Sequence, residues 1–175
     1  MMKKLVNKVF RKFKRYRLFI NPRIYRPSSK PFISGDSFRK ISDHIFDETK
    51  TLKVGKVKTN DLVFVRNDLL KYFFENYHIK IKNPYILISH NADEPIDESY
   101  QKYLDSKIVH WFCFKLNFPM SKKVTPIPAG LENMRYRKNG IIRNFLKVEK
   151  IKESKDKIMS SFNENTNYLE RNKLK

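Results

Sequence analysis

The chain has 175 residues, of which 38 are Lys or Arg and 18 are Asp or Glu, so its formal net charge is +20. This length suits one domain and excludes two full α/β domains, while 40% hydrophobic residues exclude wholesale disorder. The single cysteine, Cys113, excludes a disulfide framework and a cysteine-based zinc site, and no apolar run reaches the ~18 residues of a membrane-spanning helix.

The positive charge lies mainly at the two ends of the chain. Residues 1–30 carry 11 basic and no acidic residues, residues 31–133 have a net charge of only +2, and residues 134–175 have a net charge of +7. Apolar residues recur at helical spacing among the first lysines and arginines: Leu5, Val6, Val9, Phe10, Phe13 and Tyr16. The pattern predicts a basic amphipathic helix, with a proline-containing linker up to residue 30.

Three interpretations of this helix stay open. Binding of residues 1–20 to an anionic membrane surface is favoured, because each Lys or Arg near such a surface contributes roughly 1 kcal/mol. Alternatively, the helix packs on the domain or forms a nucleic-acid-binding arm. The near-neutral middle of the chain argues against nucleic acid, since such folds usually carry basic residues on the body. No secretory signal core is present, so we expect a cytoplasmic protein, peripheral at the cytoplasmic face of the membrane.

The middle of the chain alternates between β-branched or aromatic runs and amphipathic patterns. We expect strands over 31–34, 61–66, 85–89, 107–113, 123–128 and 156–162, and helices over 37–46, 69–77, 99–104 and 139–151. A repeat of about 20–30 residues predicts an α/β fold with a doubly wound, mostly parallel, Rossmann-like sheet over 31–152.

Ligands of parallel α/β sheets bind beyond the carboxyl ends of the strands. This rule selects five candidate segments: 34–36, 66–68, 89–93, 114–117 and 129–133. The acidic residues that follow the third strand are more typical of a solvated loop or a helix cap than of a magnesium site: Asp93, Glu94, Asp97 and Glu98. Neither a dinucleotide-binding glycine motif nor a P-loop occurs, so we expect no metal and no bound cofactor.

Segment 89–93 is the richest in polar side chains. His90 can bind a sugar hydroxyl or act as a general base near neutral pH, and Asn91 and Asp93 can hold a polyol through paired hydrogen bonds. The alternative is a turn in which the Asn and Asp side chains bond their own backbone. Asp36 is a second candidate on the ligand side of the sheet. Residues 129–133 either direct Glu132 and Asn133 into a cleft or form a structural turn.

Several motifs occur in an order that resembles a known family. They are Ser34-Gly35-Asp36, Val63-Phe64-Val65-Arg66 with Asp68, Ile86 to Asp93, Trp111-Phe112, Ile127 to Asn133 with Asn139-Gly140, Phe162-Asn163, Thr166-Asn167 and Glu170-Arg171. From about residue 32 to 171 the chain resembles exostosin-like and polysaccharide-biosynthesis glycosyltransferases. The most specific pieces are Ser-His-Asn-x-Asp at 89–93 and Ile-Pro-x-Gly-Leu-Glu-Asn at 127–133.

The resemblance implies a GT-B type enzyme that needs no metal. The N-terminal half of such an enzyme binds the acceptor, here a glycan or lipid-linked glycan, and the C-terminal half binds a nucleotide-sugar donor. By analogy, His90 or Asp93 would be the general base that deprotonates the acceptor hydroxyl. Substrate-binding residues would be Asp36, Ser89, Asn91, Glu132 and Asn133.

The resemblance also predicts how the chain is organised. Residues 1–30 would be the helix and linker, 31–152 the acceptor-side domain, and 153–175 the start of a truncated second domain. We therefore expect a glycosyltransferase, or its acceptor-binding half working with a separate donor-binding chain. The alternatives are a non-catalytic membrane-associated carbohydrate-binding module and a basic nucleic-acid-binding α/β protein.

Overall fold

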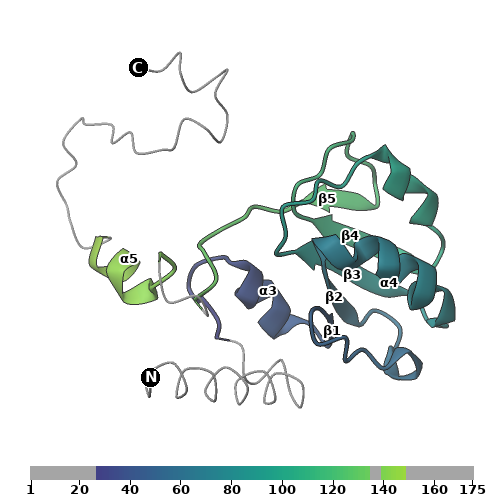
Figure 1. Cartoon of the computed structure of the whole chain (residues 1–175), viewed down its shortest axis with the longest axis horizontal. Coiled ribbons are helices and arrows are strands. Elements are labelled where there is room, and N and C mark those ends of the chain that lie inside the picture. Colours follow the sequence, from purple (N-terminus) through teal and green to yellow (C-terminus); the bar gives the residue numbers. More distant parts are fainter. Residues whose placement is uncertain (1–26, 135–138, 149–175) are drawn as a thin grey trace, which may run out of the picture. The chain divides into compact units, whose positions relative to one another are not determined.

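A computed structural model describes residues 27–134 and 139–148. The chain divides into two units, Met1–Ile142 and Arg143–Lys175. The first unit contains a five-stranded sheet, all of whose strands are parallel. The strands are β1 (His44–Phe46), β2 (Leu62–Arg66), β3 (Tyr85–His90), β4 (Ile108–Cys113) and β5 (Val124–Pro126). The predicted α/β fold with a parallel sheet is therefore confirmed (Figure 1).

The strands lie in the sheet in the order in which they occur along the chain, β1-β2-β3-β4-β5. The register aligns Val63 with Leu87 and Leu87 with Trp111, so these side chains point to the same face of the sheet. In many parallel sheets a ligand binds in the crevice at the point where the strand order reverses. The order of the described strands does not reverse, so the sheet offers no such crevice. A site at the strand ends must therefore be built by the segments that cross those ends.

One face of the sheet is covered by the helix α4 (Leu70–Asn76), which follows the short 3-10 helix η2 (Asn67–Leu69). Phe73 and Phe74 of α4 are fully buried, which stabilises the fold by about 1.5–3 kcal/mol per side chain. The Phe74 ring meets Trp111 of β4 edge to face, with ring centroids 5.7 Å apart. The cluster on this face also contains Val63, Val65, Leu87, Cys113 and Leu70.

The other face carries a smaller cluster formed by Ile45, Phe64 and Ile88, against which Phe38 of α3 (Gly35–Ile41) packs. Helices thus lie on both faces of the sheet, with α3 on one face and α4 on the other. Further short 3-10 helices connect the strands: η1 (Val54–Lys56), η3 (His78–Lys80) and η4 (Glu98–Tyr103).

Two predicted elements at the start of the domain are wrong. Residues 31–34 form no strand and make only an isolated bridge between Ser34 and Leu131. The helix expected over 37–46 ends at Ile41, because Ser42 adopts an extended conformation, and His44–Phe46 is strand β1. Ile45 fits both helical and strand spacing, and in β1 it is buried in the smaller core cluster with Phe64 and Ile88.

The remaining expectations fall on the ends of the chain. The helix α5 (Ile142–Val148), all but the first residue of which belongs to the second unit, occupies the middle of the helix predicted over 139–151. The predicted N-terminal amphipathic helix and the strand over 156–162 lie outside the described residues. Among the helices of 27–134 and 139–148, none is long and apolar enough to cross a membrane.

Candidate functional site

A cavity of about 390 Å³ lies beyond the carboxyl ends of β3 and β4. Four of the five segments selected from the sequence contribute to its lining, which consists of Gly35, residues 90–93, Phe114 and residues 129–133. Of the predicted site residues, His90, Asn91, Asp93, Glu132 and Asn133 line the cavity. Residues nearly 100 positions apart in the sequence therefore meet at one site.

The cavity is formed because the start of α3 and the segment after β5 come together across the strand ends. The Leu131 N–H donates to the Ile33 carbonyl oxygen at 2.8 Å. Gly130 has a φ of +66°, and a Cβ at this position would overlap the Ile33 carbonyl oxygen. A Cβ on Gly35 would overlap the Asn91 side chain and lie 2.7 Å from His90 Nδ1. Gly130 is therefore required for the close approach of the two backbones, and Gly35 leaves room for the Asn91 and His90 side chains.

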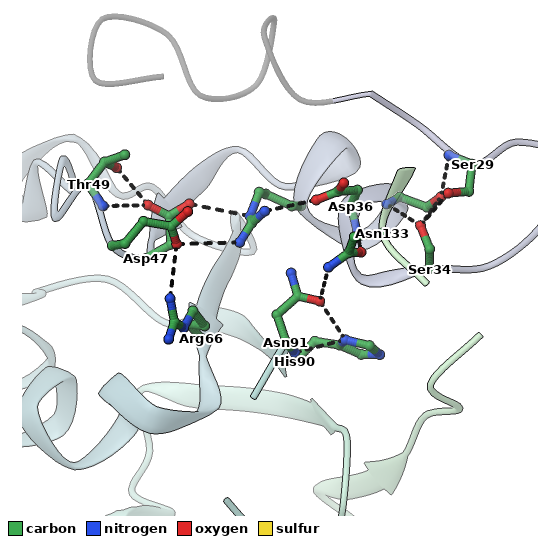
Figure 2. A network of polar contacts seen from close by, with 12 residues as sticks. Ser29, Ser34, Asp36, Asp47, Thr49, Arg66, His90, Asn91 and Asn133 are labelled. Carbon is green, nitrogen blue, oxygen red and sulfur yellow. Dashed lines mark hydrogen bonds and ion pairs between the residues drawn. The ribbon is translucent and has the colours of Figure 1, made fainter. Parts of the chain in front are cut away.

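Asn133 links three of the converging segments through its side-chain amide. Its Oδ1 accepts a hydrogen bond from the Asp36 N–H at 2.7 Å, and its Nδ2 donates to Asn91 Oδ1 at 3.0 Å. Figure 2 shows these contacts running from Asp36 through Asn133 to Asn91, whose backbone N–H donates to His90 Nδ1. The amide therefore fixes the position of Asn91, whose φ of +71° turns the chain sharply after β3.

His90 is buried between two aromatic rings, Phe114 at 4.6 Å and Phe38 at 5.4 Å between centroids. Its Nδ1 accepts a hydrogen bond from the Asn91 N–H at 2.9 Å, and its Nε2 lies 3.1 Å from the Pro128 carbonyl oxygen, to which it donates. Burial lowers the pKa of His90 below its usual value, so the ring is neutral at pH 7. Both nitrogens are engaged by backbone groups, and the ring serves to join segments 89–93 and 127–133.

Two carboxylates give the cavity its acidic character. The Asp93 side chain is fully exposed and forms an ion pair with Lys115 Nζ at 3.0 Å. Lys115 also donates to the Asp93 carbonyl oxygen at 3.1 Å, so it holds the loop that follows β3. Glu132 Oε2 accepts from the Asn139 N–H at 2.8 Å. Either carboxylate can accept a hydrogen bond from a ligand hydroxyl.

Two predicted site residues lie outside the cavity lining. Ser89 points to the opposite face of the sheet, where its Oγ accepts a hydrogen bond from Trp111 Nε1 at 2.9 Å. Asp36 lies behind the lining and is fully buried, with Oδ1 2.9 Å from Arg39 Nη1. Within the described residues, Asp36 Oδ2 and Asn91 Nδ2 are buried without a hydrogen-bond partner. Polar atoms in this state lower the stability of the fold.

Sequence reasoning missed Arg39, which is fully buried behind the cavity. Its guanidinium lies 3.3 Å from Asp47 as well as beside Asp36, and 5.0 Å from the centroid of the Phe64 ring. One sequence signal was available, since Asp36 precedes Arg39 by three residues and opposite charges at this spacing lie side by side on a helix.

The fifth selected segment, 66–68, supports the site through the side chain of Asn67. Its Nδ2 donates to the carbonyl oxygens of Phe114 at 3.0 Å and Glu94 at 3.2 Å. The segment that follows β2 therefore holds the loops after β3 and β4 in place, and it contributes no side chain to the cavity lining.

In the described ranges, no group of three or more His, Cys, Asp or Glu residues is arranged to hold a metal ion. Cys113 is buried, which raises the pKa of its thiol to about 12 and makes it a poor nucleophile. Comparison of the sequence with models of protein families and with curated proteins finds no match.

Proposed function

We propose that the cavity binds a neutral sugar, and that the chain is the acceptor-binding part of a glycosyltransferase. The observation that carries this proposal is the lining, which combines the Phe114 ring, the Asn91 amide and two carboxylates in one cavity at the strand ends. The sequence resemblance described above supports the same function.

The chemistry of the lining favours an uncharged polyol. Sugar hydroxyls donate hydrogen bonds to carboxylates such as Asp93 and Glu132, and the apolar face of a sugar ring can pack on an aromatic ring such as Phe114. The volume of about 390 Å³ falls within the range of small-molecule sites. No lysine or arginine is among the described residues of the lining. The Glu132 carboxylate, with a smaller contribution from Asp93, whose charge Lys115 offsets, disfavours a diphosphate. We therefore expect the nucleotide-sugar donor to bind elsewhere.

Asp93 is the better placed of the two predicted bases. Its carboxylate is exposed at the cavity, whereas both nitrogens of His90 are engaged by the backbone. In the proposed reaction, the acceptor hydroxyl oxygen attacks the anomeric carbon of the donor sugar and Asp93 accepts its proton, while the bond from that carbon to the diphosphate breaks and the nucleoside diphosphate leaves. His90 is a positioning residue, which holds the loop that carries Asp93.

Calorimetric titration with a panel of soluble neutral oligosaccharides, and with UDP as the anionic comparison, tests the binding proposal. At least one oligosaccharide is expected to bind with saturation, and the variant Asn91→Gly is expected to lose at least tenfold in affinity. Glycine tolerates the positive φ at this position, so the change removes the amide while sparing the backbone. Asn60→Gly is the matched control, since Asn60 is exposed and has a φ of +64°. UDP binding without sugar binding would contradict the proposal.

Release of UDP from UDP-sugars in the presence of the bound oligosaccharide tests for transfer. We expect the chain to catalyse transfer, and we expect the variant Asp93→Asn to have a lower kcat with little change in KM. Sugar binding without turnover, also after a donor-binding chain is supplied, would instead identify a carbohydrate-binding module.

A further inference from the structure

Five exposed lysines gather in two loops at the end of the sheet opposite the cavity. We call this surface the lysine patch, and its members are Lys53, Lys56 and Lys58 in residues 53–60 and Lys80 and Lys82 in residues 78–84. The first loop contains η1 and leads into β2, and the second contains η3 and leads into β3. Neither loop contains an acidic residue.

Hydrogen bonds fix the two loops side by side. Asn83 Nδ2 donates to the Val57 carbonyl oxygen at 2.9 Å, and the Asn60 N–H donates to the Pro84 carbonyl oxygen at 2.9 Å. The backbone of this surface is therefore defined by the fold, and the lysine side chains extend from a fixed base.

Within the described residues, the charge of the patch is not neutralised by ion pairs. None of the five lysines forms an ion pair with a residue of 27–134 or 139–148. Asp61 and Asp105 pair mainly with histidines, since Asp61 lies 2.7 Å from His44 Nε2 and Asp105 lies 3.0 Å from His78 Nε2. Asp61 also accepts a hydrogen bond from the Lys58 N–H at 2.8 Å, and its carboxylate attracts the Lys58 ammonium group without forming an ion pair with it. The patch is thus a concentrated positive surface on a domain body that is nearly neutral as a whole.

An exposed apolar side chain, that of Ile79, lies among the lysines of the patch. Ile79, between His78 and Lys80, is 63% exposed, although a side chain of this size is usually buried. An aliphatic side chain surrounded by lysines can enter the boundary between headgroups and acyl chains while the ammonium groups reach the lipid phosphates.

We propose that the lysine patch docks on an anionic lipid bilayer, with Ile79 inserted at the headgroup level. Lysine alone makes up the charge, and nucleic-acid phosphates are more often recognised by the planar guanidinium of arginine. An exposed isoleucine gains nothing from a phosphodiester backbone, whereas it gains apolar burial in a bilayer. This proposal does not depend on sugar binding in the cavity.

Docking through the patch would orient the whole domain. β3 has six residues, so its two ends are about 20 Å apart. The patch lies at the amino ends of β2 and β3, and the cavity lies beyond the carboxyl ends of β3 and β4. The cavity would therefore open away from the bilayer, toward a ligand that projects from the membrane or is dissolved in the aqueous phase.

Sedimentation of the full chain with mixed phosphatidylglycerol and phosphatidylcholine vesicles tests the proposal. The double variant Lys56→Gln/Lys80→Gln is expected to bind roughly 30-fold more weakly, since two lysines at a membrane surface contribute roughly 1 kcal/mol each. Lys71→Gln/Lys102→Gln is the matched control, because it has the same net charge and changes lysines of α4 and η4. Equal losses in the two double variants, or no loss in either, would overturn the proposal.

Insertion of residue 79 can be observed separately. A fluorophore sensitive to polarity is attached in the variant Ile79→Cys, where the buried Cys113 leaves residue 79 as the reactive thiol. A blue shift with anionic vesicles, absent with pure phosphatidylcholine and absent for a label at Lys71→Cys, is the expected result. Tighter binding of the patch to single-stranded RNA than to anionic vesicles, with no blue shift at residue 79, would contradict a lipid partner.

Discussion

Replacement of Asn133 by alanine removes the side chain that joins three segments around the cavity. The amide accepts from the Asp36 N–H and donates to Asn91 Oδ1, and the Asn133 residue is only 8% exposed. The variant Asn133→Ala retains the backbone of 129–133 and removes both hydrogen bonds. We expect the start of α3 and the turn after β3 to lose their common support.

The expected loss of unfolding free energy follows from the two groups that lose their hydrogen-bond partner, the Asp36 N–H and Asn91 Oδ1. The Asp36 N–H is fully buried, and a buried donor without a partner costs about 1–3 kcal/mol. Loss of the bond to Asn91 Oδ1 adds about 0.5–1.5 kcal/mol, because water can reach this half-buried residue in part. The free energy of unfolding should therefore fall by about 1.5–4.5 kcal/mol.

Urea unfolding followed by circular dichroism and by Trp111 fluorescence measures this change. Asn117→Ala is the control, since the Asn117 side chain is exposed and the change should shift the unfolding free energy by less than about 0.5 kcal/mol. A matching effect of the two variants would refute the assignment of Asn133 as the link between segments. A large change in the slope of the transition would instead indicate an altered unfolded state.

Further predictions concern the close backbone approach and the buried histidines. Gly130→Ala should lower the free energy of unfolding by at least about 1–3 kcal/mol, because its φ is +66° and the new Cβ would overlap the Ile33 carbonyl oxygen. In the same urea assay, Gly55→Ala should be nearly neutral, because no atom lies within 4 Å of the new Cβ. Burial lowers the pKa of both His78 and His90 below the usual 6.5, so below that pH the unfolded chain binds protons first. Their contribution to stability should be constant above about pH 6.5 and should decrease as the pH falls from there toward the folded pKa values. NMR titration of the imidazole signals checks this, and midpoints at or above 6.5 would contradict the burial that the structure assigns to them.

The sequence predicted the sheet and the cavity segments better than the first elements of the domain. Continuous apolar runs identified β3 and β4, since strands covered on both faces are apolar on both faces. Positions at strand ends then identified most of the cavity lining, because parallel strands end at one edge of the sheet. Residues 37–46 were misassigned because Ile41 and Ile45 satisfy the helical spacing, while the helix ends at Ser42.

The sequence did not reveal which way the site side chains point or which distant residues they contact. Ser89 was expected at the site, but the alternation along β3 turns it to the opposite face, toward Trp111. His90 was expected as a base, and its burial between Phe38 and Phe114 depends on segments that follow it by more than 20 residues or precede it by more than 50. The burial of Arg39 depends in the same way on Asp47, which a different element supplies.

The most direct test of the account is a map of the sugar-binding surface. In an NMR titration of the ¹⁵N-labelled chain with the oligosaccharide that binds in calorimetry, saturable shifts are expected for the backbone amides of Gly35, residues 90–93, Phe114 and residues 129–133. The amides of 53–60 and 78–84, at the opposite end of the sheet, should not shift. Shifts confined to those distant loops, or no saturable shifts around the cavity, would contradict the claim that this cavity binds a sugar.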